Sequence, residues 1–438
     1  MINETKNITV PKLRFEEFEK EGEWVHSTVQ ENCLLKGRIG YRGYTTEDLV
    51  EKDNGALVLG GKHIQNHALD LSEPTFLSWD KYYESPEIMA EIGDIIFSQR
   101  GTLGDCAIIE KEIGPATINP SMVLLKNITC NAKFLYYILI GDSIQKEVQK
   151  NRALGAIPML SQKQIKEFPF LIPINPKEQQ KIADCLSSLD DIITAENQKL
   201  QVLKVHKKGL MQQLFPAEGE TLPKLRFEEF RNLGEWVEKE LGELIEIKGR
   251  IGYRGYTVED IVNKGEGAIT LSPSNINAAG TLSFEKSTYI SWAKYEESPE
   301  IMLDEGFTVL VKTGSTFGKA ALIKKLPVKS TINPQFVVLK PIKINSVFLF
   351  LIITNSSIQR QINETVVGGA IPTLSQESIS KFEVLIPLDQ EKKEQQKIAD
   401  CLFSLEELII AQTEKIEILK IHKKGLMQGL FSNSISTR

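Results

Sequence analysis

The stretch KEQQKIADCL at Lys177–Leu186 opens a long predicted helix, and it returns unchanged at Lys393–Leu402. Asn175, Pro176 and Glu178 supply an N-cap, a proline at the first helical position and a carboxylate in the first turn. Apolar residues then recur with a 4-3-4 spacing, at Ile182, Leu186, Leu189, Ile193, Leu200, Leu203, Leu210 and Leu214, and in the second copy at Ile398, Leu402, Leu405, Ile409, Ile416, Leu419, Leu426 and Leu430. Such a pattern predicts the seam of a coiled coil.

Two equivalent seams in one chain are expected to bury each other. An antiparallel arrangement would relate the halves by an approximate twofold axis and would leave one globular domain at each end of a helical rod. Each seam is interrupted twice, by Glu196 and Lys207 in the first copy and by Gln412 and Lys423 in the second. We expect Glu196 and Gln412 to form a polar pair near the middle that fixes the register.

The repeat extends over nearly the whole chain. Five further segments recur in the same order, namely PKLRFEEF (Pro11 and Pro223), KGRIGYRGYT (Lys36 and Lys248), ESPEIM (Glu84 and Glu297), GAIP (Gly155 and Gly369) and HKKGLMQ (His206 and His422). A module of about 210 residues has therefore been duplicated in tandem. We divide the chain into a globular domain at 11–174, a helix at 175–216, a linker at 217–222, a second globular domain at 223–388 and a second helix at 389–432.

Each globular domain is predicted to be a compact α/β (α+β) domain with a twisted sheet. The expected strands are Asp94–Ser98, Met122–Lys126 and Phe168–Ile172, with Phe307–Lys312, Phe336–Lys340 and Phe382–Ile386 in the second copy. One helix is expected near Phe134–Gln149, and its counterpart near Val347–Ile362.

The composition restricts the class of protein. No stretch approaches the roughly 20 apolar residues of a membrane span, and no secretory signal is recognisable, so we expect a cytoplasmic protein without membrane contact. The five cysteines form no CxxC pair and are expected to be structural thiols. The net charge of −6 means that any affinity for nucleic acid must come from local basic loops or from a basic partner.

The alternation of globular domain and long helix, with PKLRF, RIGYRG, GxIPxLS and EQQKIAxxL motifs, resembles the specificity subunits of type I restriction-modification systems. The resemblance implies two target recognition domains, each of which reads one half of a bipartite, asymmetric site in double-stranded DNA. It also implies that the paired helices set the spacer and dock two methyltransferase subunits, in a complex that includes restriction subunits. S-adenosylmethionine, ATP and Mg²⁺ would then bind to the partner subunits, and this chain would carry no cofactor.

The loop KGRIGYRGYT is the first candidate DNA surface, because it combines three cations and two aromatic rings with glycines and contains no acid. Its candidate residues are Lys36, Arg38, Tyr41, Arg42 and Tyr44, with Lys248, Arg250, Tyr253, Arg254 and Tyr256 in the second copy. The alternative is a glycine-rich turn whose charges are merely solvated.

Residues kept in both copies cannot distinguish two different half-sites, so discrimination is expected at aligned positions that differ. Lys62, His63, Gln65 and Asn66 align with Ser274, Asn275, Asn277 and Ala278, while Ser98, Gln99, Arg100 and Thr102 align with Lys312, Thr313, Gly314 and Thr316. Most of these side chains can hydrogen-bond to base edges. Ordinary variation of polar loops is the alternative at any one of these positions.

No catalytic or metal site is predicted. TINPQF at Thr331–Phe336 resembles a methyltransferase loop but lacks its second proline, and Gly314, Gly318 and Lys319 do not have the spacing of a phosphate-binding loop. His63 and His67 have no third ligand nearby. Two other functions stay open, a scaffold that only assembles partners and a self-contained methyltransferase or nuclease.

Overall fold

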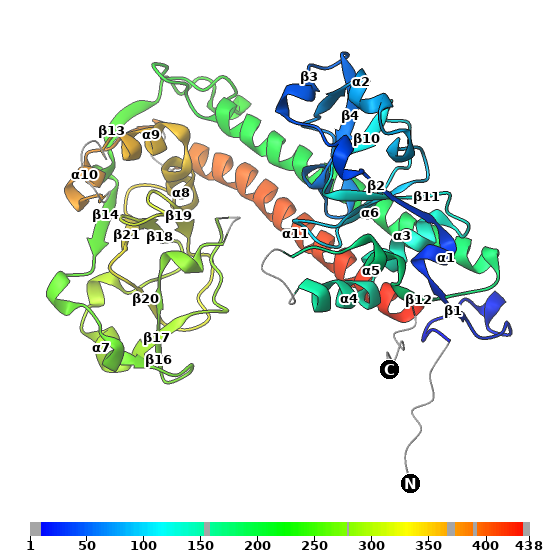
Figure 1. Cartoon of the computed structure of the whole chain (residues 1–438). Coiled ribbons are helices and arrows are strands. Elements are labelled where there is room, and N and C mark those ends of the chain that lie inside the picture. Colours follow the sequence, from blue (N-terminus) through cyan, green and yellow to red (C-terminus); the bar gives the residue numbers. More distant parts are fainter. Residues whose placement is uncertain (1–9, 153–157, 278–279, 366–372, 389–391, 432–438) are drawn as a thin grey trace, which may run out of the picture. The chain divides into compact units, whose positions relative to one another are not determined.

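The computed structural model describes residues 10–152, 158–277, 280–365, 373–388 and 392–431 (Figure 1). The side chains of Tyr41, Arg152 and Tyr253 are also outside this description. The chain divides into two compact units. The first unit comprises Met1–Gln198 and Glu414–Arg438, and the second comprises Lys199–Thr413. Among the described residues, no helix has the length and apolar character that a bilayer span requires.

The globular part of the first unit contains two four-stranded sheets, in the orders β10-β4-β7-β3 and β2-β11-β8-β9, with a separate pair β1-β12 and a hairpin β5-β6. The strands are β1 Val25–Thr28, β2 Leu34–Gly37, β3 Leu49–Val50, β4 Gly55–Leu59, β5 Ile64–Gln65, β6 Ala68–Leu69, β7 Phe76–Ser78, β8 Ile95–Ser98, β9 Cys106–Ile108, β10 Ala116–Ile118, β11 Met122–Lys126 and β12 Pro169–Ile172. The helices are α1 Val29–Asn32, α2 Trp79–Tyr83, α3 Ala132–Ile140, α4 Asp142–Arg152 and α5 Gln162–Lys166.

The second unit repeats this plan, with sheets β15-β17-β16-β20 and β14-β21-β18-β19 and the pair β13-β22. Its strands are β13 Val237–Glu240, β14 Ile245–Gly249, β15 Ile261–Val262, β16 Gly267–Leu271, β17 Thr288–Ser291, β18 Thr308–Val311, β19 Ala320–Leu322, β20 Ser330–Ile332, β21 Phe336–Pro341 and β22 Glu383–Ile386. Its helices are α7 Trp292–Glu296, α8 Ser346–Thr354, α9 Ser356–Glu364 and α10 Gln376–Ser380. The predicted mixed fold is confirmed, and each predicted strand is present with its ends within one residue.

The single helix predicted in each domain is wrong, because two helices meet there at a sharp bend. Gly141 between α3 and α4 is extended, with φ −75° and ψ 158°, and a Cβ at this position would lie 3.1 Å from the carbonyl oxygens of Tyr137 and Ile138. In the second unit Asn355 has the same extended backbone, and its side chain accepts a hydrogen bond from the Ser357 N–H. The apolar pattern continues across both bends, which explains why the sequence suggested one helix.

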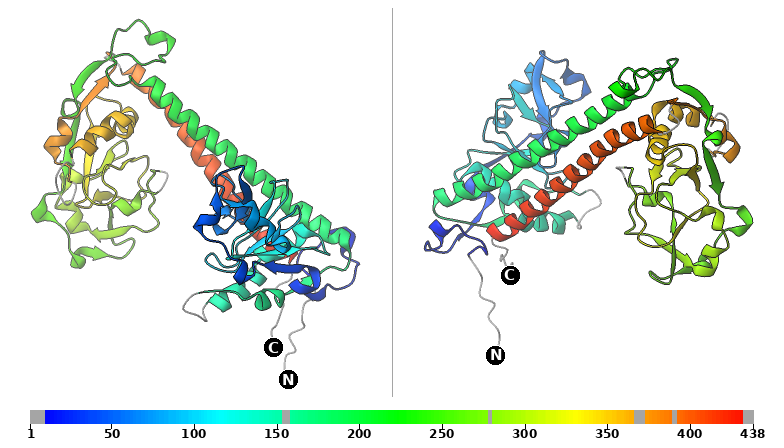
Figure 2. Two further views of the ribbon diagram at one scale, coloured as in Figure 1. Left: turned by 45° about the horizontal axis from the view of Figure 1, so that its top comes forward. Right: turned by 180° about the vertical axis from the view of Figure 1, so that it is seen from behind.

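The long helices are α6, Pro176–Leu214, and α11, Lys393–Leu430. In the first unit they run side by side in opposite directions (Figure 2), since Asp190 pairs with Lys423 while Glu196, further along α6, pairs with the earlier Lys415. In the second unit Lys207 of α6 pairs with Glu406 of α11. The two lysines that interrupt the apolar seams therefore each have a carboxylate partner on the opposite helix.

The repeated motifs at the two ends of each globular domain fasten it to a long helix. Arg14 of PKLRF donates two hydrogen bonds of 2.8 Å to Glu178 of KEQQ, and the Trp24 indole donates a third to the same carboxylate at 3.1 Å. In the second unit Arg226 binds Glu394 at 2.7 and 2.8 Å, beside Trp236. These buried, bidentate pairs fix the angle at which the helix leaves the domain.

The end of each long helix completes the opposite core. Leu430 and Phe431, at the end of α11, are buried in the first unit, where the Phe431 ring lies 5.7 Å from that of Phe134. Leu214 and Phe215, at the end of α6, are buried in the second unit, with Phe215 stacked on Phe348 at 5.4 Å. Each unit thus contains the beginning of one long helix and the end of the other.

Replacement of Arg226 by alanine should destabilise the second unit strongly. Its guanidinium and the Glu394 carboxylate are 6 % and 1 % exposed, so the substitution leaves a buried charge without its main partner. We expect a loss of about 3–5 kcal/mol in the free energy of unfolding, measured by urea denaturation. The control is Arg360→Ala, which breaks an exposed ion pair with Glu218 in the same unit. Equal effects of the two substitutions would contradict the anchoring role.

Candidate nucleic-acid interface

The first arginine of KGRIGYRGYT binds its own domain in both copies. Arg38 donates to the Ile118 carbonyl at 3.2 Å and to Thr117 Oγ1 at 3.1 Å, and it lies over the Tyr44 ring at 5.2 Å. Arg250 is 6 % exposed, donates to the Ile332 carbonyl at 2.9 and 3.1 Å, and lies 5.5 Å from the Tyr256 ring centre. Burial lowers the pKa of both guanidinium groups, because desolvation disfavours the charged form.

The second arginines bind the other repeated motif, ESPEIM. Arg42 lies 3.3 Å from Glu87, while Arg254 donates to the Glu297 carbonyl at 3.1 Å and lies 3.6 Å from Glu300. Two motifs that the duplication preserved therefore hold each other in each unit. We call KGRIGYRGYT, at Lys36–Thr45 and Lys248–Thr257, the shared loop. Its arginines bind protein atoms and so stabilise the framework of each domain.

The remaining members of the shared loop are less constrained. Lys36 and Lys248 are half-buried, and Lys248 forms an ion pair of 3.1 Å with Glu246. Tyr41 and Tyr253 were also predicted to contact DNA, but their side chains lie outside the described residues. Contact between this loop and DNA stays a prediction for these side chains.

Two residues that were predicted to read bases are buried, and each caps a short turn by accepting a hydrogen bond from the backbone. His63 is 2 % exposed; its Nδ1 accepts from the Gly60 N–H at 3.0 Å, and its Nε2 lies 3.2 Å from the Glu73 carbonyl. The equivalent Asn275 is 3 % exposed, and its Oδ1 accepts from the Ser272 N–H at 2.9 Å. Burial lowers the pKa of His63. Both side chains close the same short turn after a strand, so the structure gives them a structural role instead.

The exposed neighbours of these caps differ between the copies. Lys62 and Ser274 project from the turn itself and are exposed. Gln65 and Asn66 are exposed in the β5-β6 hairpin, where Asn66 and His67 both have positive φ, at 51° and 63°. In the second unit Asn277 is exposed, and its amide donates to Thr281 Oγ1 at 2.7 Å. Ala278 lies outside the described residues.

The predicted alignment of the loop after β8 with the loop after β18, in which Ser98 corresponds to Lys312, is wrong by one residue. Met122 pairs with Ser98 in the first unit, and Phe336 pairs with Val311 in the second. The sequence TINP occurs at Thr117–Pro120 and at Thr331–Pro334, and Met122 and Phe336 each stand two residues after it. Ser98 is therefore equivalent to Val311. The next equivalent pairs are Gln99 with Lys312 and Arg100 with Thr313. The extra residue of the second copy lies later, between the two positive-φ glycines Gly314 and Gly318, whose counterparts are Gly101 and Gly104.

Loops that follow different strands meet at one edge of each domain. Strands β4 and β10 are parallel, so their carboxyl ends lie together, and Asn119 donates its N–H to the Leu59 carbonyl at 2.9 Å. The loop after β8 joins them, because the Gln99 N–H donates to the Ser121 carbonyl at 2.9 Å. A Cβ on Gly61 would lie 3.4 Å from Thr102 Oγ1. The second unit has the equivalent bonds from Asn333 to Leu271 and from Lys312 to Gln335, both at 2.8 Å.

We call the side chains at this edge the strand-end rim. It consists of Lys62, Gln99, Arg100, Thr102, Ser121 and Met159 in the first unit, and of Ser274, Lys312, Thr313, Thr316, Gln335 and Thr373 in the second. All are exposed or half-buried, none is acidic, and most can donate or accept hydrogen bonds. The rims differ in sequence while the frame that carries them is the same.

Two pairs of rim residues were missed in the sequence. Ser121 and Gln335 differ inside the TINP turns, which were considered only as a methyltransferase motif. Met159 and Thr373 differ just after the GAIP motifs, and they form bridges to Arg100 and Thr313 respectively. Single differences within otherwise preserved motifs were the signal that would have found them.

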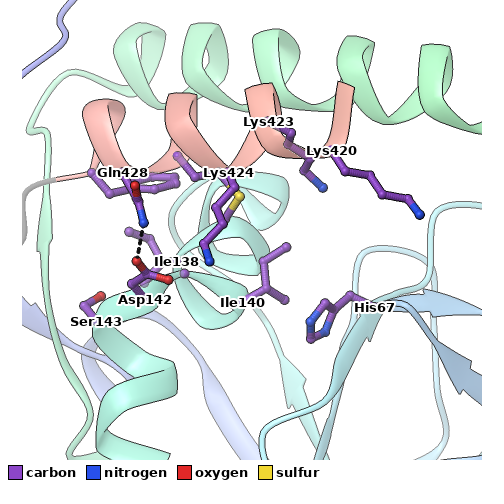
Figure 3. A pocket seen from close by; sticks show the side chains of 12 residues that line it. His67, Ile138, Ile140, Asp142, Ser143, Lys420, Lys423, Lys424 and Gln428 are labelled. Atoms are coloured by element: carbon purple, nitrogen blue, oxygen red, sulfur yellow. Dashed lines mark hydrogen bonds between the residues drawn. The ribbon is translucent and has the colours of Figure 1, made fainter. Parts of the chain in front are cut away.

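A separate pocket of 290 Å³ lies between the globular domain and α11 in the first unit (Figure 3). His67 faces it from the β5-β6 turn, and Lys424 points toward it from α11. At its border Lys423 pairs with Asp190 at 2.6 Å, and Gln428 donates to Asp142 at 2.8 Å. The first contact joins α11 to α6, and the second attaches α11 to α4 of the domain. Among the described residues, no group of three or more His, Cys, Asp or Glu side chains has the arrangement of a metal site.

A family model described as "Type I restriction modification DNA specificity domain" matches the chain twice, at residues 60–205 and 234–420. The chain belongs to this family. The first match begins just after β4 and the second begins before β13, and each contains the strand-end rim and continues into a long helix. The family domain is therefore present in both halves, as the internal repeat predicted.

Curated relatives and solved structures agree with this membership. The chain is 24 % identical over 372 residues to the "Type I restriction enzyme MjaVIII specificity subunit" of Methanocaldococcus jannaschii, covering 80 % of this chain and 81 % of that protein. It is also 24 % identical to the "Putative type I restriction enzyme MjaX specificity subunit" of the same organism, covering 86 % of each chain. The fold is similar to the crystal structure of a type I restriction-modification S subunit from M. genitalium, with a TM-score of 0.60, 17 % identity and coverage of 96 % and 99 %.

Replacement of Arg250 by methionine should loosen the shared loop of the second unit. The Ile332 carbonyl and Thr331 hydroxyl would lose their buried donors, at a cost of about 1–3 kcal/mol in the free energy of unfolding. Hydrogen exchange should accelerate at 250–257, measured by mass spectrometry. The control is Lys286→Met, an exposed residue of the same unit. Unchanged exchange in the loop would contradict the framework role of Arg250.

Proposed function

We propose that this chain is the DNA sequence-specificity subunit of a type I restriction-modification complex. It reads a bipartite, asymmetric site in double-stranded DNA and positions methyltransferase and restriction subunits on it. Family membership supports the general role. The main support for a bipartite, asymmetric site is that the same domain frame occurs twice with two different strand-end rims.

A duplicated frame with different rims is suited to two different half-sites. Each rim exposes donors and acceptors that match base edges, and its cations can also contact phosphates. The first rim contributes Lys62 and Arg100, and the second contributes Lys312. Because the chain as a whole carries a charge of −6, we infer that the partner subunits supply part of the affinity for phosphate.

We infer that this chain has no chemistry of its own and that S-adenosylmethionine, ATP and Mg²⁺ bind to the partners. The fragments that resemble enzyme motifs have structural roles. Asn119 and Asn333 accept N–H bonds from Ser121 and Gln335 at 3.0 Å and so close the TINP turns. A Cβ on Gly318 would lie only 3.2 Å from Ile362 of α9. Close packing against this helix therefore explains why a glycine stands at this position.

Sequencing of the methylome should identify the activity. In cells that contain the chain and its methyltransferase partner, one bipartite adenine-methylation motif should be present, and deletion of the chain alone should remove it. A methylome that does not change on deletion would exclude the proposal and favour a scaffold without DNA recognition. Methylation or cleavage by the purified chain alone, with S-adenosylmethionine or Mg²⁺, would instead favour a self-contained enzyme.

The long helices support a stoichiometry of two methyltransferase subunits. Ile418 and Ile421 of α11 are 66 % and 71 % exposed, and their counterparts Val202 and Val205 of α6 are 68 % and 70 % exposed. In each pair the residues are three apart and so share one helix face. Exposed aliphatic pairs that are preserved in both copies fit two equivalent docking sites for an apolar partner surface.

Replacement of both Ile418 and Ile421 by glutamate should remove one methyltransferase subunit from the complex. Burial of each aliphatic side chain contributes about 1.5–3 kcal/mol, so the affinity of that site should fall by at least roughly 100-fold. Native mass spectrometry should then detect one bound subunit. The equivalent change at Val202 and Val205 should remove the other.

The control for these variants is Val258→Glu, which adds a charge at an exposed aliphatic residue of the second globular domain. This variant should still bind two subunits. Binding of two subunits by the Ile418 and Ile421 variant would show that the partner docks elsewhere on the chain.

A further inference from the structure

We propose that the position occupied by Gln99 in the first domain and by Lys312 in the second determines specificity, with glutamine selecting adenine and lysine selecting guanine at one base of each half-site. This inference rests on the proposed function and assigns part of the discrimination to a single pair of residues. The strand register makes these two residues equivalent.

The backbone holds these two residues in the same way. The Gln99 N–H donates to the Ser121 carbonyl at 2.9 Å, and its carbonyl accepts from the Leu160 N–H at 3.0 Å. The Lys312 N–H donates to the Gln335 carbonyl at 2.8 Å, and its carbonyl accepts from the Leu374 N–H at 2.9 Å. In both domains the main-chain N–H and C=O of this residue are hydrogen-bonded. The side chain therefore projects from an equivalent, fixed position of the backbone. A difference in recognition at this point must come from the side chain.

The surrounding residues bring this position to the surface of the rim. Gln99 and Lys312 each follow directly after the last residue of a buried central strand, β8 or β18, and both are half-buried. The next residues, Arg100 and Thr313, are bridged to Met159 and Thr373 of the segment after GAIP. The position therefore lies between two loops that differ between the copies, on a backbone that does not.

The glutamine has the groups that adenine requires. Its Nε2 donates one hydrogen to the Pro120 carbonyl at 3.1 Å, which orients the amide. The second hydrogen and the amide oxygen are available from the same group, and together they match the N7 acceptor and N6 donor of adenine.

The lysine has the groups that guanine requires. The ammonium group of Lys312 lies close to the shared loop, because a Cβ on Gly249 of this loop would be 3.8 Å from the Lys312 Nζ. The ammonium group carries three donors and no acceptor, so it matches the two acceptors N7 and O6 of guanine. Against adenine it would face the N6 donor, which it cannot accept. The two side chains consequently favour different purines from the same backbone point.

Reciprocal substitution tests the inference in the full complex. Chains with Lys312→Gln or Gln99→Lys would be assembled with the methyltransferase subunits and given a DNA library in which both half-sites are randomised. Sequencing of the methylated fraction should show that Lys312→Gln shifts one base of the second domain's half-site from guanine toward adenine by roughly tenfold or more. Gln99→Lys should produce the opposite shift in the other half-site. The spacer and the unaltered half-site should not change.

The controls make the same change of charge at the amino-terminal ends of β16 and β4, two strands whose carboxyl ends lie at the rim. Lys264 precedes β16, and Asn54 precedes β4, and both are exposed. Lys264→Gln and Asn54→Lys should leave the motif unchanged. Lys312→Arg should keep the guanine, because arginine matches the same two acceptors, and it provides a conservative variant if Lys312→Gln assembles poorly.

The outcomes separate the inference from the proposed function. An unchanged motif in both swapped variants, or weaker methylation of all sequences alike, would assign Gln99 and Lys312 to phosphate contacts or to none and would overturn the inference alone. A wild-type complex whose methylation shows no dependence on half-site sequence would overturn the proposed function itself.

Discussion

The buried pairs between Arg14 and Glu178 and between Arg226 and Glu394 are the contacts on which the rest of each unit depends. Each joins the first residues of a globular domain to the first turn of the long helix that follows it, across more than 150 residues of sequence. The indole of Trp24 or Trp236 shares the carboxylate. Because a charge buried at this point is costly without its partner, the helix and the domain cannot separate easily. The rim therefore keeps a fixed orientation relative to its own helix.

The sequence was sufficient for the parts of the fold that depend on periodicity and repetition. The strands and the long helices follow from patterns that local packing enforces, and the lysines that interrupt the seams were visible as interruptions. The bends at Gly141 and Asn355 were missed, because an apolar pattern continues through a bend when both helices pack on the same core. The equivalence of Gln99 and Lys312 was also missed, since only the strand register locates a single inserted residue.

For the candidate site, residue chemistry alone was a poor guide to exposure. Arg38, Arg250, His63 and Asn275 have side chains that suit DNA, yet their hydrogen bonds are made within the domain. Preservation in both copies was the better signal. The arginines that are identical in the two copies maintain the frame, and most rim residues differ, although His63 and Asn275 differ and are buried. Comparison of the two copies thus helps to distinguish buried framework residues from the exposed rim within a single chain.

The burial of Leu430 and Phe431 in the first unit has a consequence for the order of events during synthesis. These residues follow the whole second unit in the sequence, yet they complete the core to which Trp24 and Val29 belong. The amino-terminal domain must therefore wait, with part of its apolar surface uncovered, until the whole second unit has been translated. The second unit has no such delay, because α6 precedes it in the chain. Of the two units, the first should consequently complete its core after the second, although most of it is translated earlier.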